Sequence, residues 1–567
     1  MNETDRGSPA LKGVKKALDG SDEDGDCLRI REGAASLFVP KKNEVFYNPV
    51  QTFNRDMSVI AIRSWRGPFL RNKKELLEKK KQKKEIKRQK IAPLLGEKDQ
   101  EQLNTASESC SVSCGEKKAA LNDIDMYNCV DKPHESCLPS FNILDAFSAT
   151  GIRAIRYVKE IQNIEYVVAN DYDKSSIEMV KKNSIYNNVS EKVKLSFEDA
   201  RFIMYKHLVQ RKHFDVIDLD PYGTASPFID AAVQSVSNGG LLCVTCTDLA
   251  VLAGGGYPEK CFSNYGSMPF RHSVFCHEQA LRIVLHTISS SSARYGRHMT
   301  PLLSVFADFY IRLFVKIETS PYNVKFLHNN IMMSYLCSGC YTFYNQPIGK
   351  TSPCKNLNTY KHFNSQGPII SPNCEFCGFK LHISGPMWSG PLHDKEFVKN
   401  ALNILESESI DIYETLPRMK RMLSIIEDEL VNPFYYSPAH LSKILHCQTP
   451  SLKDIVSALI NSGYLVSFTH ASPGCIKTNA SPKIIWDIMR SWIKQCPVSK
   501  EHIRDGTAGK EILKNEPDIS VSFLFNPDIN KIFKPGLVKY QLNHTKNWGP
   551  KAKAKVKTRE NGNQNPA

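Results

Sequence analysis

An acidic residue, a proline and an aromatic residue stand together at the end of an apolar run near the middle of the chain. The run Phe214–Asp220 is followed by Pro221, Tyr222 and Gly223. Methylation of an exocyclic amine needs such a group, because a carboxylate and a turned-out carbonyl accept the two N–H groups while an aromatic ring holds the base flat. The same Asp-Pro-Tyr-Gly sequence also suits a type I turn that has no chemical role.

A loop farther upstream favours the chemical interpretation. Phe141–Asp145 is predicted to be a buried strand, Ser148–Gly151 a tight turn, and Ile152–Val158 a helix with apolar residues three and four apart. This order is typical of ligand-binding loops in parallel sheets. Because the loop has one glycine where a dinucleotide fingerprint has three, it disfavours a pyrophosphate and favours S-adenosylmethionine, which has no phosphate.

Two further acidic positions follow predicted strands. Asp171 ends the strand Ile164–Asn170 and can accept both ribose hydroxyls, although it also suits the N-cap of a helix that begins at Lys174. Asp199 and Ala200 follow the strand Val193–Phe197, where a carboxylate and a backbone N–H can contact the adenine edge. Taken singly, Asp199 is only a loop residue.

The paired cysteines form the second strong signal. Two Cys-x-x-Cys knuckles each bring two thiolates to one side, and together they complete a tetrahedral set suited to Zn²⁺; the ligands are Cys337, Cys340, Cys374 and Cys377. Four thiolates leave no open position, so the metal is expected to be structural. Accidental thiols and a redox pair are the alternatives, and the redox pair lacks the expected βαβ setting. An insert at 350–366 is expected to bulge out of the ribbon.

Length and composition limit the class of protein. With 567 residues and 41% hydrophobic content, the chain is long enough for two to four domains. We expect no membrane insertion, because no apolar run reaches 18 residues. The acidic start shows neither a secretory signal nor a transit peptide. The net charge is +15, and residues 71–90 hold eleven Lys or Arg against three acids. That run predicts a solvated helical or disordered segment, a nuclear import signal or a phosphate contact.

The α/β pattern extends from Phe141 to about Lys316. Gly240–Thr245 is a later strand, and an antiparallel end pair is expected within Leu302–Phe306 and Phe309–Lys316. Farther on, Ser437–Leu445 and Leu452–Ile460 are predicted helices, and a hairpin is predicted to pair residues 464–469 with residues 475–478. A helix-turn-helix with a wing often binds nucleic acid backbones, although a plain packing role is equally compatible.

Several motifs occur in a characteristic order. They are Phe46–Pro49, Asn54–Asp56, Ser148–Arg153, Asp218–Gly223, Thr245–Asp248, Tyr257–Lys260, the paired cysteines, Gly385–Trp388 and Thr545–Pro550. In this order the chain resembles the tRNA (guanine-26) N2-dimethyltransferase family in its eukaryotic form. The resemblance extends from about Gly33 to Pro550, apart from an insertion at about 66–137.

The resemblance implies the transfer of two methyl groups from S-adenosylmethionine to N2 of one guanine of tRNA. It implies that Asp220 accepts the amine proton, the Pro221 carbonyl takes the other N–H, and Phe46 and Tyr222 sandwich a base swung out of the folded tRNA. Archaeal relatives tend to have Phe at the position of Tyr222. The implied cofactor contacts are Arg55 and Arg153 to the methionine carboxylate, Asp171 to the ribose, and Asp199 with Ala200 to the adenine.

The expected fold class is α/β: a Rossmann-like class I methyltransferase domain followed by a mixed α+β C-terminal domain with a zinc ribbon-like element. The expected division is a disordered segment 1–26, the methyltransferase domain 27–320 with a solvated basic insertion at about 66–137, a C-terminal tRNA-binding domain 321–545 with a winged-helix-like part, and a basic tail 546–567. Residues 546–559 of that tail hold six bases and no acid.

The expected partner is tRNA, with no membrane and no obligate protein partner. The expected location is the nucleus, with the mitochondrion as a second compartment. Two other functions stay open on the residues alone. One is a different amine N-methyltransferase, acting on DNA adenine or protein glutamine. The other is a non-catalytic zinc-containing RNA-binding protein.

Overall fold

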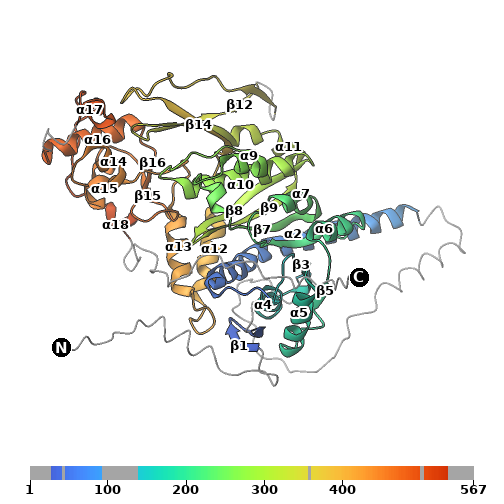
Figure 1. Ribbon diagram of the computed structural model, residues 1–567. Coiled ribbons are helices and arrows are strands. Elements are labelled where there is room, and N and C mark those ends of the chain that lie inside the picture. Colours follow the sequence, from blue (N-terminus) through green and yellow to red (C-terminus); the bar gives the residue numbers. More distant parts are fainter. Residues whose placement is uncertain (1–26, 41–44, 92–137, 355–358, 498–503, 534–567) are drawn as a thin grey trace, which may run out of the picture. The chain divides into compact units, whose positions relative to one another are not determined.

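The structure is a computed structural model that describes residues 27–40, 45–91, 138–354, 359–497 and 504–533 (Figure 1). The predicted disordered segment 1–26 and the predicted basic tail 546–567 lie outside the described residues. Residues 66–141 form one compact unit, and the described residues before and after them form the other. Within the described ranges, no helix combines the length and the apolar character needed to cross a bilayer.

A seven-stranded sheet organises the larger unit, in the order β5-β4-β3-β6-β7-β9-β8. The pairs β4–β5, β3–β6 and β6–β7 are parallel, and β7–β9 and β9–β8 are antiparallel, which confirms the predicted parallel sheet with an antiparallel end pair. Every residue of β6 is buried, as expected for a central strand covered on both faces. The strands are β3 (Phe141–Asp145), β4 (Ile164–Asn170), β5 (Val193–Ser196), β6 (Phe214–Leu219), β7 (Val236–Cys246), β8 (Arg297–Ala307) and β9 (Tyr310–Thr319).

Helices follow the strands as the sequence periodicity predicts. Buried side chains of α6, α7 and α10 form one apolar core with β3, β6, β7, β8 and β9. A hairpin of β1 (Cys27–Glu32) and β2 (Ala35–Pro40) precedes the sheet in the chain, and backbone amides of β2 donate to Asn183 and Asn187 at α5. The helices are α4 (Ile152–Glu160), α5 (Lys174–Tyr186), α6 (Ala200–Val209), α7 (Ser226–Ser235), α8 (Leu249–Leu252), α9 (Pro258–Tyr265) and α10 (Cys276–Ala293).

The long helix α2 crosses the expected start of the insertion. It runs from Thr52 to Ile91 with Pro68 inside it, so the chain does not leave regular structure near residue 66. The basic run 71–90 is therefore helical, which is one of the two conformations predicted for it. Residues 92–137, the remainder of the expected insertion, lie outside the described residues.

The chain beyond β9 combines small sheets with helices. Strands β10 (Ile331–Cys337), β11 (Phe343–Pro347) and β14 (Leu381–Trp388) form an antiparallel sheet, and β12 (Gly349–Pro353) pairs with β13 (Tyr360–Asn364). The two predicted helices and the predicted hairpin are confirmed as α14 (Pro438–Leu445), α15 (Leu452–Asn461), β15 (Val466–Phe468) and β16 (Ile476–Thr478), whereas their arrangement as a helix-turn-helix with a wing stays a prediction. The other elements are α11 (Pro321–Val324), η4 (Leu327–Asn330), α12 (Lys395–Glu406), α13 (Leu416–Asp428), α16 (Pro482–Gln495), α17 (Ala508–Ile512) and α18 (Ile529–Ile532).

Candidate active site and metal centre

The carboxyl ends of neighbouring strands bring the two predicted loops together. Asp145 at the end of β3 lies in register with Asp218 of β6, and the Ala146 amide donates to the Asp218 carbonyl at 3.1 Å. The Ser148 amide donates to the Asn170 carbonyl at the end of β4 at 2.9 Å. Gly151 then turns into α4 with φ +81°, where an added Cβ would lie 3.1 Å from Val180. The sequence thus folds both loops onto one edge of the sheet, where parallel sheets bind ligands.

Asp220 lies against the helix that follows the upstream loop. Its carboxylate forms an ion pair with the Arg153 guanidinium in the first turn of α4, and 12% of its side chain is exposed. The sequence resemblance directs Arg153 to the methionine carboxylate. In the structure Arg153 instead contacts Asp220, and Asp218 at 3.5 Å. Pro221 is buried, and the loop after it is tied to the end of β7, because the Thr247 amide donates to the Gly223 carbonyl and the Gly223 amide donates to the Thr247 hydroxyl, both at 2.9 Å.

A buried charge network stands behind Asp220. Arg312 of β9 donates to Asp218 at 2.7 Å, and the Tyr157 hydroxyl donates to the same carboxylate. Ser58 accepts from Arg153 at 3.2 Å and from Arg312 at 2.9 Å. Burial alone would raise the pKa of Asp218, but the Arg312 and Arg153 cations outweigh it and hold the pKa below its usual value. Asp218 is therefore a fixed anion that orients Arg153.

Asp145 lies at the same strand ends as the predicted site residues, and the sequence interpretation did not name it. Its side chain is buried, and neither carboxylate oxygen has a hydrogen-bond partner among the described residues. Burial and then the neighbouring Asp218 charge raise its pKa from 3.8 to about 7. The Arg153 charge and the Ser148 hydroxyl only partly offset the cost of burying this carboxylate, and a cationic ligand would offset it further. Its position at the end of a buried strand, immediately before the loop, is the signal that marks it.

Phe46 and Tyr222 lie together but not as a parallel pair. Their ring centroids are 6.3 Å apart and the ring planes meet at 81°, and Tyr222 is 51% exposed. A base held flat between two rings needs both rings parallel to it. One ring must therefore turn before the implied sandwich can form, and the exposed Tyr222 has the space to do so.

The predicted cofactor acids have local partners. Asp171 accepts from the Ala149 amide at 2.9 Å and from the Asp173 amide at 3.0 Å, and burial raises its pKa. The N-cap of α5 is Asp173, so the alternative of Asp171 as that cap is wrong. Asp199 is the N-cap of α6 and accepts from the Arg201 amide at 2.7 Å, while Ala200 is the buried first residue of that helix. Asp199 is thus more than a loop residue.

Two aromatic residues beside these acids were also missed. Tyr172 follows Asp171 and Phe197 follows β5, and the two side chains are 79% and 57% exposed. Their centroids lie 6.4 Å apart with an interplanar angle of 32°. Exposed rings at adjacent strand ends are suited to covering a flat heterocycle. The signal in the sequence is an aromatic residue within two positions of each predicted acid.

Arg55 is occupied by a structural partner. Its guanidinium binds Glu32 through two contacts of 2.6 Å, and Glu32 also accepts from Arg156 at 2.8 Å. Although burial opposes ionisation of Glu32, Arg55 and Arg156 lower its pKa to about 2. The expected contact of Arg55 with a methionine carboxylate stays a prediction, because the described side chain is held by β1.

The four predicted metal ligands converge. The Sγ atoms of Cys337 and Cys377 are 3.3 Å apart, those of Cys340 and Cys374 are 3.6 Å apart, and all four lie within 4.8 Å of one another. A tetrahedral Zn²⁺ with Zn–S bonds of about 2.3 Å needs sulfurs about 3.8 Å apart. The described cysteines form no disulfide. The cluster therefore fits a closed, structural zinc ion.

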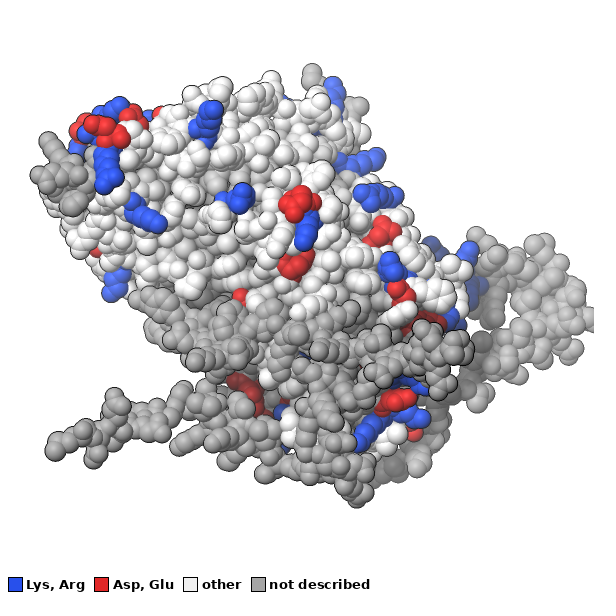
Figure 2. Space-filling view, viewed as in Figure 1, with Lys and Arg blue, Asp and Glu red and all other residues white. Residues whose placement is uncertain are grey.

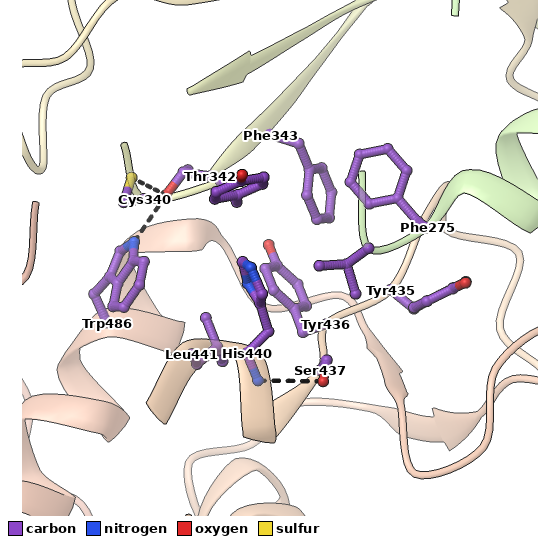
Figure 3. Close-up of a pocket in the computed structure, with 12 residues that line it drawn as sticks. Phe275, Cys340, Thr342, Phe343, Tyr435, Tyr436, Ser437, His440, Leu441 and Trp486 are labelled. Atoms are coloured by element: carbon purple, nitrogen blue, oxygen red, sulfur yellow. Dashed lines mark hydrogen bonds between the residues drawn. The ribbon is translucent and has the colours of Figure 1, made fainter. Parts of the chain in front are cut away.

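Two successive hydrogen bonds link the cysteine cluster to α16. The Trp486 indole N–H donates to the Thr342 hydroxyl at 2.9 Å, and that hydroxyl lies 3.0 Å from the Cys340 sulfur (Figure 3). Because the indole can only donate, the Thr342 hydroxyl is free to donate to the sulfur. A pocket beside these hydrogen bonds lies between the Cys337–Cys340 knuckle and α14. Aromatic rings that include Tyr436 and Phe343 line it. None of the predicted methyl-transfer residues lines it.

A second group of possible ligands does not require a metal. The His470 Nδ1 lies 2.7 Å from Glu429, and His393 Nε2 lies 4.0 Å from the same carboxylate. Lys477 contacts both Glu429 and Glu278 at 3.1 Å. An ammonium group already within the cluster balances its charge and would repel a divalent cation. We interpret it as a buried polar cluster.

Comparison with known proteins places the chain in a family. A family model described as N2,N2-dimethylguanosine tRNA methyltransferase matches residues 26–490. The tRNA (guanine(26)-N(2))-dimethyltransferase of Schizosaccharomyces pombe is 45% identical over 538 residues, covering 94% of each chain. The human protein of the same name is 39% identical over 530 residues, covering 93% of this chain and 77% of its own.

One solved structure and a second fungal relative agree with that match. The Saccharomyces cerevisiae relative, named as mitochondrial, is 40% identical over 548 residues and 92% of each chain. Trm1 from Pyrococcus horikoshii, solved with S-adenosyl-L-methionine, superposes with a TM-score of 0.58 at 25% identity, covering 81% of this chain and 99% of its own. The chain belongs to the N2,N2-dimethylguanosine tRNA methyltransferase family.

Proposed function

We propose that this protein transfers two methyl groups from S-adenosylmethionine to N2 of guanine-26 of tRNA, giving N2,N2-dimethylguanosine. The observation that carries the proposal is the contact between Asp220 and Arg153, since it joins the acid-Pro-aromatic loop to the helix that follows the cofactor loop. Family membership supplies the substrate class. Asp220 would supply the carboxylate that meets the entering amine.

The methyl transfer does not require a strong proton acceptor. The neutral N2 attacks the methyl carbon while the sulfonium bond breaks, and N2 becomes strongly acidic as the N–C bond forms. A carboxylate is a weak base, yet it suffices for such an acidic proton. Asp220 takes the proton and releases it to water, because 12% of its side chain remains exposed. The Pro221 carbonyl accepts the other N–H of the amine.

The cofactor would lie along the ends of β3, β4 and β5. Asp171 keeps free lone pairs beside its two amide contacts, so it can still accept the ribose hydroxyls. Asp199 and the Ala200 amide would meet the adenine edge, and Tyr172 and Phe197 would cover its ring. Asp145 would face the cationic end of the cofactor, which carries a sulfonium and an ammonium group.

The guanine would be swung out of the tRNA and held by Phe46 and Tyr222. Stacking contributes roughly 1–3 kcal/mol per base, which can offset the loss of a weak purine contact. A second transfer requires space beside Asp220 for one methyl group already on N2. The extra hydroxyl of Tyr222 leaves the stacking face of the ring unchanged.

The C-terminal region would serve binding rather than transfer. Cys337, Cys340, Cys374 and Cys377 would hold Zn²⁺, which fixes the knuckles of β10 and β14 against α14–α16. The helix-turn-helix of α14 and α15 with its β15–β16 wing would contact the tRNA backbone. The nucleus, with the mitochondrion as a second compartment, stays the predicted location.

The test is product analysis with purified protein and labelled cofactor. Unmodified tRNA should yield labelled dimethylguanosine, and the same tRNA with adenine in place of guanine-26 should yield none. Label that appears instead in DNA adenine or in protein glutamine would replace the proposal with another amine methyltransferase. A failure to bind S-adenosylmethionine in calorimetry would instead indicate a non-catalytic RNA-binding protein.

A further inference from the structure

The segment around the zinc knuckles has an unusual charge content. Although 59 of the 567 residues are acidic, Glu375 is the one acidic residue between Glu318 and Asp394. The same interval holds five lysines and no arginine: Lys325, Lys350, Lys355, Lys361 and Lys380. An interval that excludes acids and keeps lysines produces a positive surface, which attracts a phosphate backbone.

The hairpin β12–β13 projects from this interval. It pairs with no other strand among the described residues, and all five residues of β13 are exposed. The hairpin contacts η4, where the Asn329 side-chain amide donates to the Thr351 hydroxyl at 2.8 Å, and the edge of the molecule that carries the hairpin and α11 shows basic side chains in Figure 2. Such an arm contributes little to the apolar core.

The two faces of the hairpin differ. Tyr360 and His362 point to one face, where their rings lie 5.1 and 5.4 Å from that of Phe326. His362 also lies 5.1 Å from His328 of η4. This face anchors the hairpin to the chain that precedes β10. The aromatic contacts therefore explain the inner face without any ligand.

The outer face carries two cations and a ring. Lys350 pairs in register with Phe363, and Lys361 pairs with Ser352 two residues along, so these side chains share one face. Phe363 is 44% exposed, and both lysines are exposed. Neither lysine has an acidic partner among the described residues. Exposed lysines around an exposed ring match what single-stranded nucleic acid needs, namely phosphate contacts and one stacking platform.

We propose that the outer face of the β12–β13 hairpin, formed by Lys350, Lys361 and Phe363, binds the tRNA substrate outside the methyl-transfer site. The lysines contact backbone phosphates, and Phe363 stacks on an unpaired base. This inference rests on the proposed function, because that function supplies the RNA. The whole interval is positively charged. It therefore favours RNA, which carries a negative phosphate at each nucleotide, over a protein surface with few acidic residues.

The experiment compares charge reversal on this face with charge reversal elsewhere. Lys350→Glu with Lys361→Glu should weaken tRNA binding at least tenfold and lower the slope of log affinity against log salt by about 1.5. Lys181→Glu with Lys212→Glu, which changes the net charge equally at exposed positions of the larger unit, is the matched control. Cofactor affinity, zinc content and the rate at saturating tRNA should match those of the wild type.

A second variant isolates the ring. Phe363→Ala should weaken tRNA binding about tenfold, and Phe363→Trp should restore it. Binding and salt slope equal to those of the control would overturn the proposal, even with methylation intact. Wild-type protein that binds tRNA through this face but forms no dimethylguanosine would instead contradict the proposed function alone. The milder pair Lys350→Ser with Lys361→Ser covers the case in which charge reversal prevents folding.

Discussion

Around Asp220, charged side chains dominate, whereas around Cys340 the polar partners are thiols, one hydroxyl and one indole. The first region places Asp145, Asp218 and Asp220 near Arg153 and Arg312 at strand ends. The second closes four sulfurs within a core formed with α14–α16. A site that moves protons and methyl groups keeps charges that a ligand can complete. A site that fixes architecture leaves no position open.

Removing the metal should have the largest effect on this comparison. A strong chelator, or Cys374→Ser, should release one zinc ion per chain and cost several kcal/mol of stability, because closed zinc sites contribute directly to folding. Hydrogen exchange should rise in α14–α16. Cofactor affinity should change little, and Cys447→Ser, outside the cluster, is the control. Unchanged hydrogen exchange in α14–α16 after metal loss would show that the metal does not fix the architecture of this region.

Breaking the buried ion network should come next. Arg312→Met leaves Asp218 buried beside Asp145 with one cation fewer, which should cost about 3–5 kcal/mol in denaturant unfolding. Adding Asp218→Asn removes the uncompensated buried charge and should recover much of the lost stability. A double variant as unstable as the single one would mean that Arg312 acts through packing and not through charge.

The pKa of Asp145 predicts a pH dependence. In the folded protein it lies at about 7, against 3.8 as its ordinary value. The stability from this proton is therefore fully present below about pH 4, falls as pH rises, and is lost once pH passes about 7. Because the ionised form attracts a cation, cofactor affinity should rise about tenfold from pH 6 to pH 8. Calorimetry of Asp145→Asn should show neither dependence.

The smallest effect is expected from the loss of the hydrogen bond between Trp486 and Thr342, beside the zinc site. Trp486→Phe removes the indole N–H that Thr342 accepts and should cost about 1 kcal/mol, with faster zinc release to a chelator. Trp492→Phe, which loses a bond to the Gln448 carbonyl instead, is the matched control. Equal rates of zinc release from the two variants would show that the Trp486–Thr342 hydrogen bond does not stabilise the metal site.

The sequence was sufficient where local spacing decides the structure. The strand, turn and helix at 141–158, the convergence of the four cysteines and the helices α14 and α15 follow from periodicity and knuckle spacing. Partners distant in the chain could not be predicted. Glu32 occupies Arg55 from another element, and Arg153 turns to Asp220. The helix α5 begins at Lys174, as predicted, so its N-cap is the residue immediately before it, Asp173, and not Asp171.

Substitution of the carboxylate tests the central claim most directly. Asp220→Asn keeps the shape of the side chain and removes the proton acceptor, and Asp230→Asn, on α7, is the control. The account predicts that dimethylguanosine formation falls about 10²–10⁴-fold while the affinities for S-adenosylmethionine and tRNA change less than about threefold. Formation at the wild-type rate, or a loss of affinity as large as the loss of rate, would contradict it.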